Sequence, residues 1–391
     1  MSNSWNMVPF TEAVDICDTL RKPINNSERA SRIAGKKQSE LYPYYGATGQ
    51  VGFIDDYITD GEYVLLGEDG APFLDAYAPK AYLINGKTWV NNHAHVLRSK
   101  TNNKYLCYYL NSFNYKGFVS GTTRLKLTQA EMKRIPVPVP PLPEQERIVA
   151  RIEELFSQLD AGVETLKKTK AQLAVYRQAV ITEAFSVKNN TSYVCLSDIA
   201  QISGGITKGR DLSGAETIEL PYLRVANVQN GYLDLAEIKT IHLRADEKER
   251  YLLNFGDVLY TEGGDRDKLG RGTVWREEIK ECVHQNHVFK ARVNQSKAIS
   301  EYVAFWSMST PARNYFYQKG KQSVNLASIN KTVLSALTLP LPALEKQREI
   351  IIRIKSRLSV CDSIEQTVDA ALQQAEAMRQ SILKDAFEGR L

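Results

Sequence analysis

Hydrophobic positions recur at helical spacing along two long segments of the chain, Gln145–Phe185 and Gln347–Phe387. In the first segment, apolar or small residues alternate at steps of four and three from Ile148, and in the second they do so from Ile350. Such a heptad pattern predicts long helices that bury one apolar stripe against a partner helix. Neither segment contains proline, and a proline-rich stop precedes each.

The two segments are copies of one another, because they align without a gap at an offset of 202 residues. Identical pairs include Gln145/Gln347, Ile148/Ile350, Asp160/Asp362, Arg177/Arg379 and Phe185/Phe387. A helix with one apolar stripe must bury it, and the other copy is the nearest partner. We therefore expect the copies to pack antiparallel. Packing of each helix on its own globule, or homodimerisation through the helices, remains open at this point.

Particular residues are expected where the two helices pair or dock a partner. In the first helix they are Ile148, Ile152, Leu155, Leu159, Leu166 and Leu173, and in the second they are Ile350, Ile354, Ile364, Val368, Met378 and Ile382.

The segments outside the helices carry short apolar runs separated by turn residues, which is typical of strands. We predict strands at 51–54, 63–66, 81–84 and 258–260, and a short helix late in each segment, at 105–110 and 302–306. Asn85-Gly86 is a hairpin turn signal. This mixture predicts an α+β globule in each segment.

Weak matches in a single order indicate that the globules are also repeats. They pair Pro43–Tyr45 with Pro221–Leu223, Gly52–Asp55 with Gly231–Asp234, Val64–Leu65 with Val258–Leu259, and Asn92-His93 with Asn286-His287. The changing offset predicts about 15 extra residues in the second copy, around Asp246–Arg250.

The expected organisation is a pseudo-two-fold α+β chain, with two α/β-mixed domains separated by two long antiparallel coiled-coil helices. The predicted segments are 1–143 (first domain), 144–186 (central helix), 187–343 (second domain) and 344–391 (C-terminal helix).

Composition narrows the class of protein further. The net charge is +5, and the surplus of positive charge lies in the two globular segments. This placement fits a weak electrostatic attraction of each globule to phosphate groups. No stretch is apolar for the length of a membrane span, and the first residues lack the features of a secretory signal. The five cysteines are scattered without a CxxC pair, which favours a reducing cytoplasm over a zinc or disulfide site.

Catalytic signatures are missing from the sequence. There is no GxxxxGK[ST] loop, no Gly-x-Ser-x-Gly elbow and no Asn/Asp-Pro-Pro-Tyr/Phe tract of an adenine methyltransferase. His93, His95, His284 and His287 lack a neighbouring set of Cys or carboxylate ligands, so we interpret them as structural and expect no metal. These observations favour a non-catalytic chain.

Several tracts resemble a known family, the specificity subunits of type I restriction–modification systems. Pro140–Val149 resembles the start of that family's central helix, and Ser381–Leu391 resembles its C-terminal end. Tyr42–Gly49 and Asn91–Leu97 resemble parts of its first recognition domain. The resemblance covers nearly the whole chain and its order of domains and helices.

The resemblance implies a division of labour. Each target-recognition domain would read one half of a bipartite site in double-stranded DNA, while the helix pair fixes the gap and docks two modification (methyltransferase) subunits. Restriction (motor–nuclease) subunits could join. No cofactor is expected on this chain, because S-adenosylmethionine belongs to the modification subunit and ATP to the restriction subunit.

Basic and aromatic loop residues are the candidate DNA contacts, since phosphate contacts outnumber base contacts in such interfaces. They are Lys36, Lys37, Tyr44, Tyr45, Thr122, Arg124 and Lys126 in the first globule, and Lys208, Arg210, Arg266, Lys268, Arg271, Lys319 and Lys321 in the second. For any single one of them, a solvated loop charge or a buried tyrosine is about as good an interpretation.

Two other functions remain as alternatives. One is a standalone DNA-binding nuclease with duplicated recognition domains, which would need spare sequence for a catalytic domain. The other is a helical adaptor that does not bind DNA.

Overall fold

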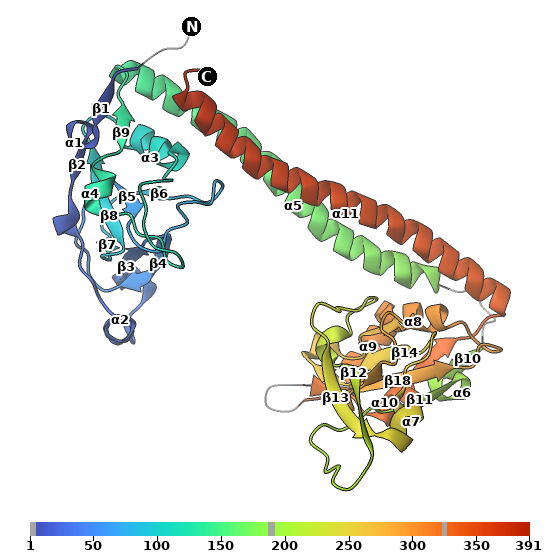
Figure 1. Cartoon of the computed structure of the whole chain (residues 1–391). Coiled ribbons are helices and arrows are strands. Elements are labelled where there is room, and N and C mark those ends of the chain that lie inside the picture. Colours follow the sequence, from blue (N-terminus) through green and yellow to red (C-terminus); the bar gives the residue numbers. More distant parts are fainter. Residues whose placement is uncertain (1–4, 187–191, 323–326) are drawn as a thin grey trace. The chain divides into compact units, whose positions relative to one another are not determined.

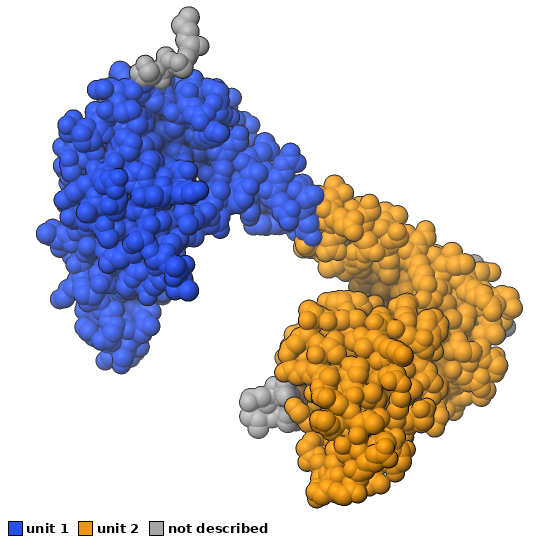
Figure 2. Space-filling view, viewed as in Figure 1, with its two compact units in different colours: residues 1–168, 368–391 blue, residues 169–367 orange. Residues whose placement is uncertain are grey.

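The computed structural model describes residues 5–186, 192–322 and 327–391, and it contains two compact units (Figure 2). Unit 1 comprises residues up to 168 together with 368–391, and unit 2 comprises residues 169–367. Each unit holds one globule and part of each long helix. Globule 1 denotes the described residues before 142, and globule 2 those from 192 to 343. Because the units divide within the helices rather than at their ends, the four predicted segments stay a prediction.

Globule 1 alternates short strands and helices. In chain order its elements are β1 (Met7–Pro9), α1 (Phe10–Ala13), β2 (Val14–Ile16), α2 (Asn26–Ile33), β3 (Tyr42–Gly46), β4 (Gly49–Ile54), β5 (Tyr63–Gly67), β6 (Ala81–Ile84), β7 (Trp89–Val90), β8 (Ala94–Ser99), α3 (Asn103–Ser112), α4 (Gln129–Met132) and β9 (Pro136–Pro138).

Globule 2 follows the same order with additional short elements. They are β10 (Tyr193–Cys195), α6 (Leu196–Ile199), β11 (Ala200–Ser203), β12 (Thr217–Leu223), β13 (Lys239–Arg244), α7 (Lys248–Tyr251), β14 (Val258–Thr261), β15 (Gly263–Gly264), β16 (Gly272–Val274), β17 (Val283–His284), β18 (Val288–Val293), α8 (Ser300–Met308), α9 (Thr310–Lys319), β19 (Lys321–Gln322), β20 (Ala327–Ser328), α10 (Lys331–Ser335) and β21 (Thr338–Pro340).

Sheet topology confirms that the globules are copies. The four-stranded sheet has the order β2-β8-β5-β6 in globule 1 and β11-β18-β14-β16 in globule 2. Each globule also has a three-stranded sheet with one parallel pair, in the order β4-β3-β7 or β13-β12-β17, and globule 2 has a further sheet of order β15-β20-β19. In both copies the first and last strands of the globule pair, as β1-β9 and β10-β21. The predicted strands and the two late helices, α3 and α8, are confirmed.

Two details of the sequence alignment are wrong. Gly52–Asp55 does not correspond to Gly231–Asp234, because Phe53 pairs with Pro43 while Thr240, on β13, pairs with Pro221. The extra residues of globule 2 are therefore divided between the connection before β13 and the region around α7.

The predicted hairpin at Asn85-Gly86 is also wrong. The turn exists, and Gly86 has a positive φ of 73°. However, β6 before it pairs with β5, whereas β7 after it pairs with β3 in another sheet. Gly86 instead exchanges two backbone hydrogen bonds with Gly61, at 3.1 and 3.4 Å. A local turn signal does not fix which strand will be the partner.

The end of each long helix docks onto a globule through a repeated aromatic residue. In unit 1 the ring of Phe387 packs edge-on against Tyr105 and Tyr109 of α3. In unit 2 the ring of Phe185 packs edge-on against Tyr302 and Trp306 of α8. Phe185 is buried by its contact and Phe387 is half-buried, so an aromatic side chain holds each helix end on its globule.

The first turn of each helix copy is fixed by a buried glutamine. The amide of Gln145 donates to the carbonyl of Pro140, and that of Gln347 donates to Pro342, both at 2.8 Å. Both side chains are fully buried. Buried amides need partners for both ends, and the two oxygens accept from Thr101 and from the backbone of Ile299.

Within each unit the two long helices, α5 (Leu142–Ala184) and α11 (Leu344–Phe387), lie side by side and antiparallel (Figure 1). In unit 1 Asp160 of α5 forms an ion pair with Arg379 of α11. In unit 2 Arg177 of α5 pairs with Asp362 of α11 at 2.7 Å. The repeat equates Asp160 with Asp362 and Arg177 with Arg379, so the second pair is the first with the helices exchanged. The expected antiparallel pairing with pseudo-two-fold character is confirmed.

Two residues predicted at the seam face away from it: Ile364 and Met378 are 40% and 48% exposed. One series of buried or half-buried positions runs along the whole of α11: Ile350, Ile354, Leu358, Cys361, Glu365, Val368, Leu372, Ala375, Arg379, Leu383 and Ala386. These steps follow the 3.6-residue period of a straight helix, whereas the prediction used the 3.5-residue heptad, which drifts by about 20° per heptad.

The remaining predicted seam positions differ in burial. Buried are Ile148, Ile152, Leu173, Ile350, Ile354 and Val368, and half-buried are Leu155, Leu159, Leu166 and Ile382. Among the described residues, no helix combines the length and the apolar character that crossing a membrane requires.

Candidate nucleic-acid interface

Three loops meet at the same place in both globules. In globule 1 the backbone of Glu68 donates to the carbonyl of His93 and accepts from Leu127, each at 2.8 Å. In globule 2 Glu262 donates to His287 and accepts from Ile329, each at 2.9 Å. The loop after β5 in globule 1, and after β14 in globule 2, therefore lies between the loop that carries His93 or His287 and the loop that carries Leu127 or Ile329. Main-chain hydrogen bonds, which do not depend on side chains, hold it there.

A cleft opens at this junction in each globule. Cleft 1 has a volume of about 820 Å³ and is lined by Ile24, Asn25, Asn26, Arg29, Tyr44, Gly46, Ala47, Thr48, Val51, Asp69, Gly70, Asn91, His93, Thr123 and Arg124. Cleft 2 has a volume of about 520 Å³ and is lined by Val225, Glu262, Gly263, Gly264, His287, Ala327 and Ser328. The same framework thus carries a cleft with different lining residues in each copy.

Cleft 1 presents two arginine side chains that are held by neighbours. The Nε of Arg124 lies 2.7 Å from a carboxylate oxygen of Asp69, whose other oxygen is 3.5 Å from Nδ1 of His93. The guanidinium of Arg29 lies over the ring of Tyr44, 4.9 Å from its centroid, and donates to the carbonyl of Val51. A planar guanidinium fixed in this way is suited to bind two acceptors at once.

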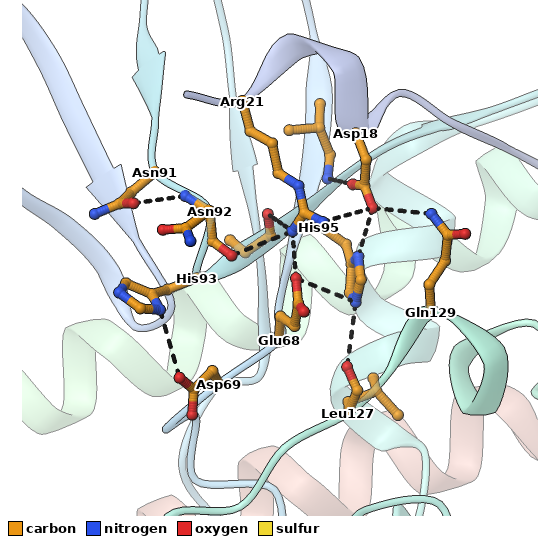
Figure 3. Close-up of polar contacts among 12 residues, drawn as sticks. Asp18, Arg21, Glu68, Asp69, Asn91, Asn92, His93, His95, Leu127 and Gln129 are labelled. Carbon is orange, nitrogen blue, oxygen red and sulfur yellow. Dashed lines mark hydrogen bonds and ion pairs between the residues drawn. The ribbon is translucent and has the colours of Figure 1, made fainter. Parts of the chain in front are cut away.

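A buried polar network lies behind cleft 1 (Figure 3). Nδ1 of the fully buried His95 is 2.8 Å from Asp18, and its Nε2 is 3.2 Å from the carbonyl of Leu127. Arg21 forms ion pairs with Asp18, at 3.2 Å, and with Glu68. The network therefore connects the loop after β5, which carries Glu68, to the segment directly after β2, which carries Asp18 and Arg21.

Asp18 carries a shifted pKa in this network. Burial acts to raise the pKa of its carboxyl, but the hydrogen bonds from His95 and Val96 and the charge of Arg21 outweigh it, so the pKa is lowered. The carboxylate therefore stays ionised and continues to bind its partners at neutral pH.

Cleft 2 presents a carboxylate. Oε2 of Glu262 lies 2.6 Å from Nδ1 of His287, and both side chains are partly exposed. The rest of the described lining is small or apolar. No ion pair to an arginine is recorded for Glu262 among the residues that the structure describes, so its carboxylate can accept from a ligand in the cleft.

Globule 2 buries its charges in a different place. Asp257 is buried and accepts two hydrogen bonds from Arg292, at 2.9 and 2.8 Å. Lys290 is also buried and donates to the carbonyls of Arg250 and Leu252, and burial lowers its pKa to about 8. None of these residues was predicted as a functional residue from the sequence, although a lysine within the apolar strand β18 was a signal.

Of the residues predicted to contact DNA in globule 1, Tyr44 and Arg124 line cleft 1. Nζ of Lys126 lies 3.5 Å from Oε1 of Glu68. Lys37 and Thr122 are exposed. Lys36 forms an ion pair with Asp55, and Tyr45 is half-buried and stacks on Tyr82. The structure does not gather this set at one place.

The residues predicted in globule 2 lie outside the described lining of cleft 2. Arg210 makes two hydrogen bonds to Glu247, Arg271 donates to Gln229, and Lys268 pairs with Asp265. Arg266 lies over the ring of Tyr317. The remaining three, Lys208, Lys319 and Lys321, are exposed.

Sequence reasoning missed Arg29 and three asparagines of cleft 1, Asn25, Asn26 and Asn91. A signal was present, because Asn25 and Glu28 stand at the spacing of a helix start. The side chain of Asn25 accepts from the backbone of Glu28 at 2.8 Å and caps α2. Recognising this cap would have placed Arg29 on an exposed first turn.

The histidines lie in separate environments. His284 is buried and its Nδ1 is 2.6 Å from the carbonyl of Val288, while its Nε2 has no hydrogen-bond partner. Among the described residues, no group of three or more His, Cys, Asp or Glu side chains is placed to hold a metal ion.

Comparison with known proteins identifies relatives of both halves of the chain. A family model described as "Type I restriction modification DNA specificity domain" matches residues 10–174 and again 189–374. A type I restriction enzyme specificity subunit of Haemophilus influenzae is 38% identical over 149 residues, which are 38% of this chain and 36% of the relative. The StySPI specificity subunit of Salmonella potsdam is 26% identical over 304 residues, covering 73% of this chain.

The chain spans 36% and 65% of the lengths of these two relatives. A solved structure concerned with complex assembly and conformational transition of the type I restriction–modification system has a similar fold. Its TM-score is 0.69 at 17% identity, with 100% of this chain and 99% of the other covered. At this level of identity the likeness concerns the fold alone.

Proposed function

This chain belongs to the type I restriction–modification DNA specificity family, and we propose that it is the DNA-recognition subunit of a type I restriction–modification complex. Each globule reads one half of a bipartite site in double-stranded DNA. The observation that carries the proposal is the repetition itself: one framework, present twice, opens a cleft at the same three loops with different lining residues.

The partners supply the chemistry. Two modification subunits dock along α5 and α11 and methylate adenine with S-adenosylmethionine, and restriction subunits that use ATP can join the same complex. The chain itself is non-catalytic and binds no cofactor. We place the complex in the cytoplasm, where its DNA partner is found and where five unpaired cysteines, all free here, are stable.

The helix pair serves as the ruler between half-sites. Two readers joined by a rigid spacer bind best when the half-site distance matches the spacer. The repeated ion pairs and the docked ends Phe185 and Phe387 stiffen this spacer within each unit. The four segments bounded at 143, 186 and 343 correspond to reader, spacer, reader and spacer.

The test is to purify the chain with its modification subunits and to map methylated adenines on genomic DNA. We expect methylation within one bipartite motif with a fixed gap. Methylation without any sequence requirement, or within a single contiguous motif, would contradict the proposal. DNA cleavage by the isolated chain would favour a nuclease instead.

A second test addresses the ruler. Four residues inserted into the middle of α5 should alter or abolish recognition at the natural gap, while the bases of both half-sites stay the same. A variant that reads different half-site bases at an unchanged gap would show that the helices do not set the spacing.

A further inference from the structure

Two backbone contacts show where the copies differ beside the clefts. In globule 1 the backbone of Cys17 donates to Val96 and that of Lys22 donates to Val90, at 2.7 and 2.9 Å. In globule 2 Ser203 pairs with Lys290, and the backbone of Ile206 donates to His284 at 2.8 Å. Between these anchors globule 1 has four residues, Asp18 to Arg21, and globule 2 has only Gly204 and Gly205.

The glycine pair cannot supply the charges of globule 1. A Cβ atom added to Gly205 would overlap the carbonyl oxygen of His284, so no side chain fits at that position. Leu66 and Tyr260 are equivalent, because they follow the matched residues Val64–Leu65 and Val258–Leu259. Leu66 pairs with His95 and Tyr260 pairs with Phe289, so Phe289 takes the place of His95 in globule 2. Globule 2 therefore lacks counterparts of Asp18, Arg21 and His95 at these positions.

This difference changes the role of the equivalent glutamates. Arg21 and Lys126 both pair with Glu68, whose side chain is only 15% exposed and does not line cleft 1. Glu262, which pairs with no arginine among the described residues, lines cleft 2 and touches His287. Cleft 1 instead presents Arg124, whose side chain is 60% exposed and is oriented by Asp69.

We propose that Arg124 and Glu262 are specificity-determining residues that read base edges of opposite hydrogen-bonding character. Arg124 donates to the N7 and O6 acceptors of a guanine in the half-site read by globule 1. Glu262 accepts from the exocyclic amino group of a cytosine in the other half-site. These are the pairings that side-chain geometry favours in the major groove. The inference rests on the proposed function and names the chemistry of its two sites.

The neighbouring residues support a role in base contact. Asp69 fixes the guanidinium of Arg124, and Nδ1 of His287 lies 2.6 Å from Glu262 and orients its carboxylate. A carboxylate in cleft 2 would repel a phosphate, so a base edge with an exposed amino group is the complementary ligand. The distinct lining of the clefts also explains how one framework can serve two different half-sites.

The experiment uses the chain in complex with its modification subunits and measures methylation of duplexes that carry each of the four bases at each half-site position. Arg124→Ala should lose discrimination for guanine at one position of one half-site, by roughly 5- to 150-fold. Arg124→Lys retains the charge but not the planar fork, and it should fail to restore discrimination. A uniform loss across all sequences that Arg124→Lys restores would assign Arg124 to a phosphate and overturn the inference.

Glu262→Gln should relax discrimination at one position of the other half-site and leave the first unchanged. Glu237→Gln is the matched control, because Glu237 is exposed in globule 2 and lies outside the described lining of cleft 2. If the wild-type complex methylates no bipartite motif, the proposed function itself fails. If it does so while the Arg124 and Glu262 variants retain full discrimination at every position, only the base-reading inference fails.

Discussion

Globule 1 and globule 2 share strand order and loop framework but differ in where they place buried charge. Globule 1 holds the Asp18–Arg21–Glu68–His95 network behind its cleft, whereas globule 2 buries Asp257 and Lys290, with the partly exposed Arg292 bound to Asp257. Two equivalent main-chain hydrogen bonds join the three loops in both copies. The comparison teaches that backbone pairing preserves the site's position, while a local change as small as Gly204-Gly205 can alter its chemistry.

The largest expected effect is loss of a helix dock. Phe185→Ala removes a ring that is 5% exposed between Tyr302 and Trp306 and should destabilise unit 2 by about 3–5 kcal/mol. Phe387→Ala should destabilise unit 1 by a smaller amount, because Phe387 is only half-buried. Hydrogen-exchange mass spectrometry reports each unit separately. Equal protection of α8 in Phe185→Ala and wild type would show that the contact does not hold the unit together.

A second prediction concerns the loss of folding stability in acid, which we expect in globule 2. Burial lowers the pKa of His284 to about 4, below its unfolded value of about 6.5. The unfolded chain therefore binds a proton that the folded chain does not, and stability falls as pH drops from about 6.5 to 4, by about 3 kcal/mol.

The matched variant is His284→Val, because Val90 occupies the equivalent place in globule 1, where Tyr45 pairs with Val90 as Leu223 pairs with His284. Urea unfolding of unit 2, followed between pH 7 and pH 4, should show a smaller loss of stability in the variant. An unchanged pH dependence would mean that another group is responsible.

A third prediction tests the network of globule 1. His95→Phe introduces the residue of globule 2 and leaves Asp18 without its 2.8 Å partner. A buried group that loses its hydrogen bond costs about 1–3 kcal/mol, so unit 1 should be destabilised by that amount. No change on His95→Phe would show that solvent replaces the bond.

The smallest effect is expected at the repeated ion pairs of the helices. Arg177→Met removes contacts to Asp362 and Glu365, and Arg379→Met removes one to Asp160. Partly exposed pairs contribute about 0–1 kcal/mol, and the Arg177 variant should lie at the upper end because it loses two partners. Thermal unfolding at low and high salt checks this, since added salt should narrow the difference from wild type. A larger loss at Arg379 would reverse the expected order.

The sequence predicted the two long helices, their pairing, the late helices α3 and α8 and the strands β4, β5, β6 and β14, because helical periodicity and apolar runs are local signals. Register was harder: the match of Gly52–Asp55 to Gly231–Asp234 failed, since strand pairing depends on residues far apart in the chain. The prediction that Ile364 and Met378 lie in the seam between the helices was wrong, because a straight helix does not keep a strict heptad.

The candidate site was predicted only in part. Tyr44 and Arg124 line cleft 1, but the cationic loop residues chosen in globule 2 lie away from the described lining of cleft 2. Counting positive charge favoured Arg266 and Arg271, whereas the cleft is lined by Glu262 and His287. Composition cannot reveal which of two equivalent glutamates is neutralised by an arginine, because Arg21 lies 47 residues from Glu68 in the chain.

The most direct measurement is the methylated motif of a complex in which the globule between β10 and β21 is replaced by a second copy of the globule between β1 and β9. These boundary strands pair in the same way in both copies. The account predicts a symmetric motif, with the half-site of globule 1 present twice in inverted orientation. An assembled, active complex that still methylates the original asymmetric motif would contradict it.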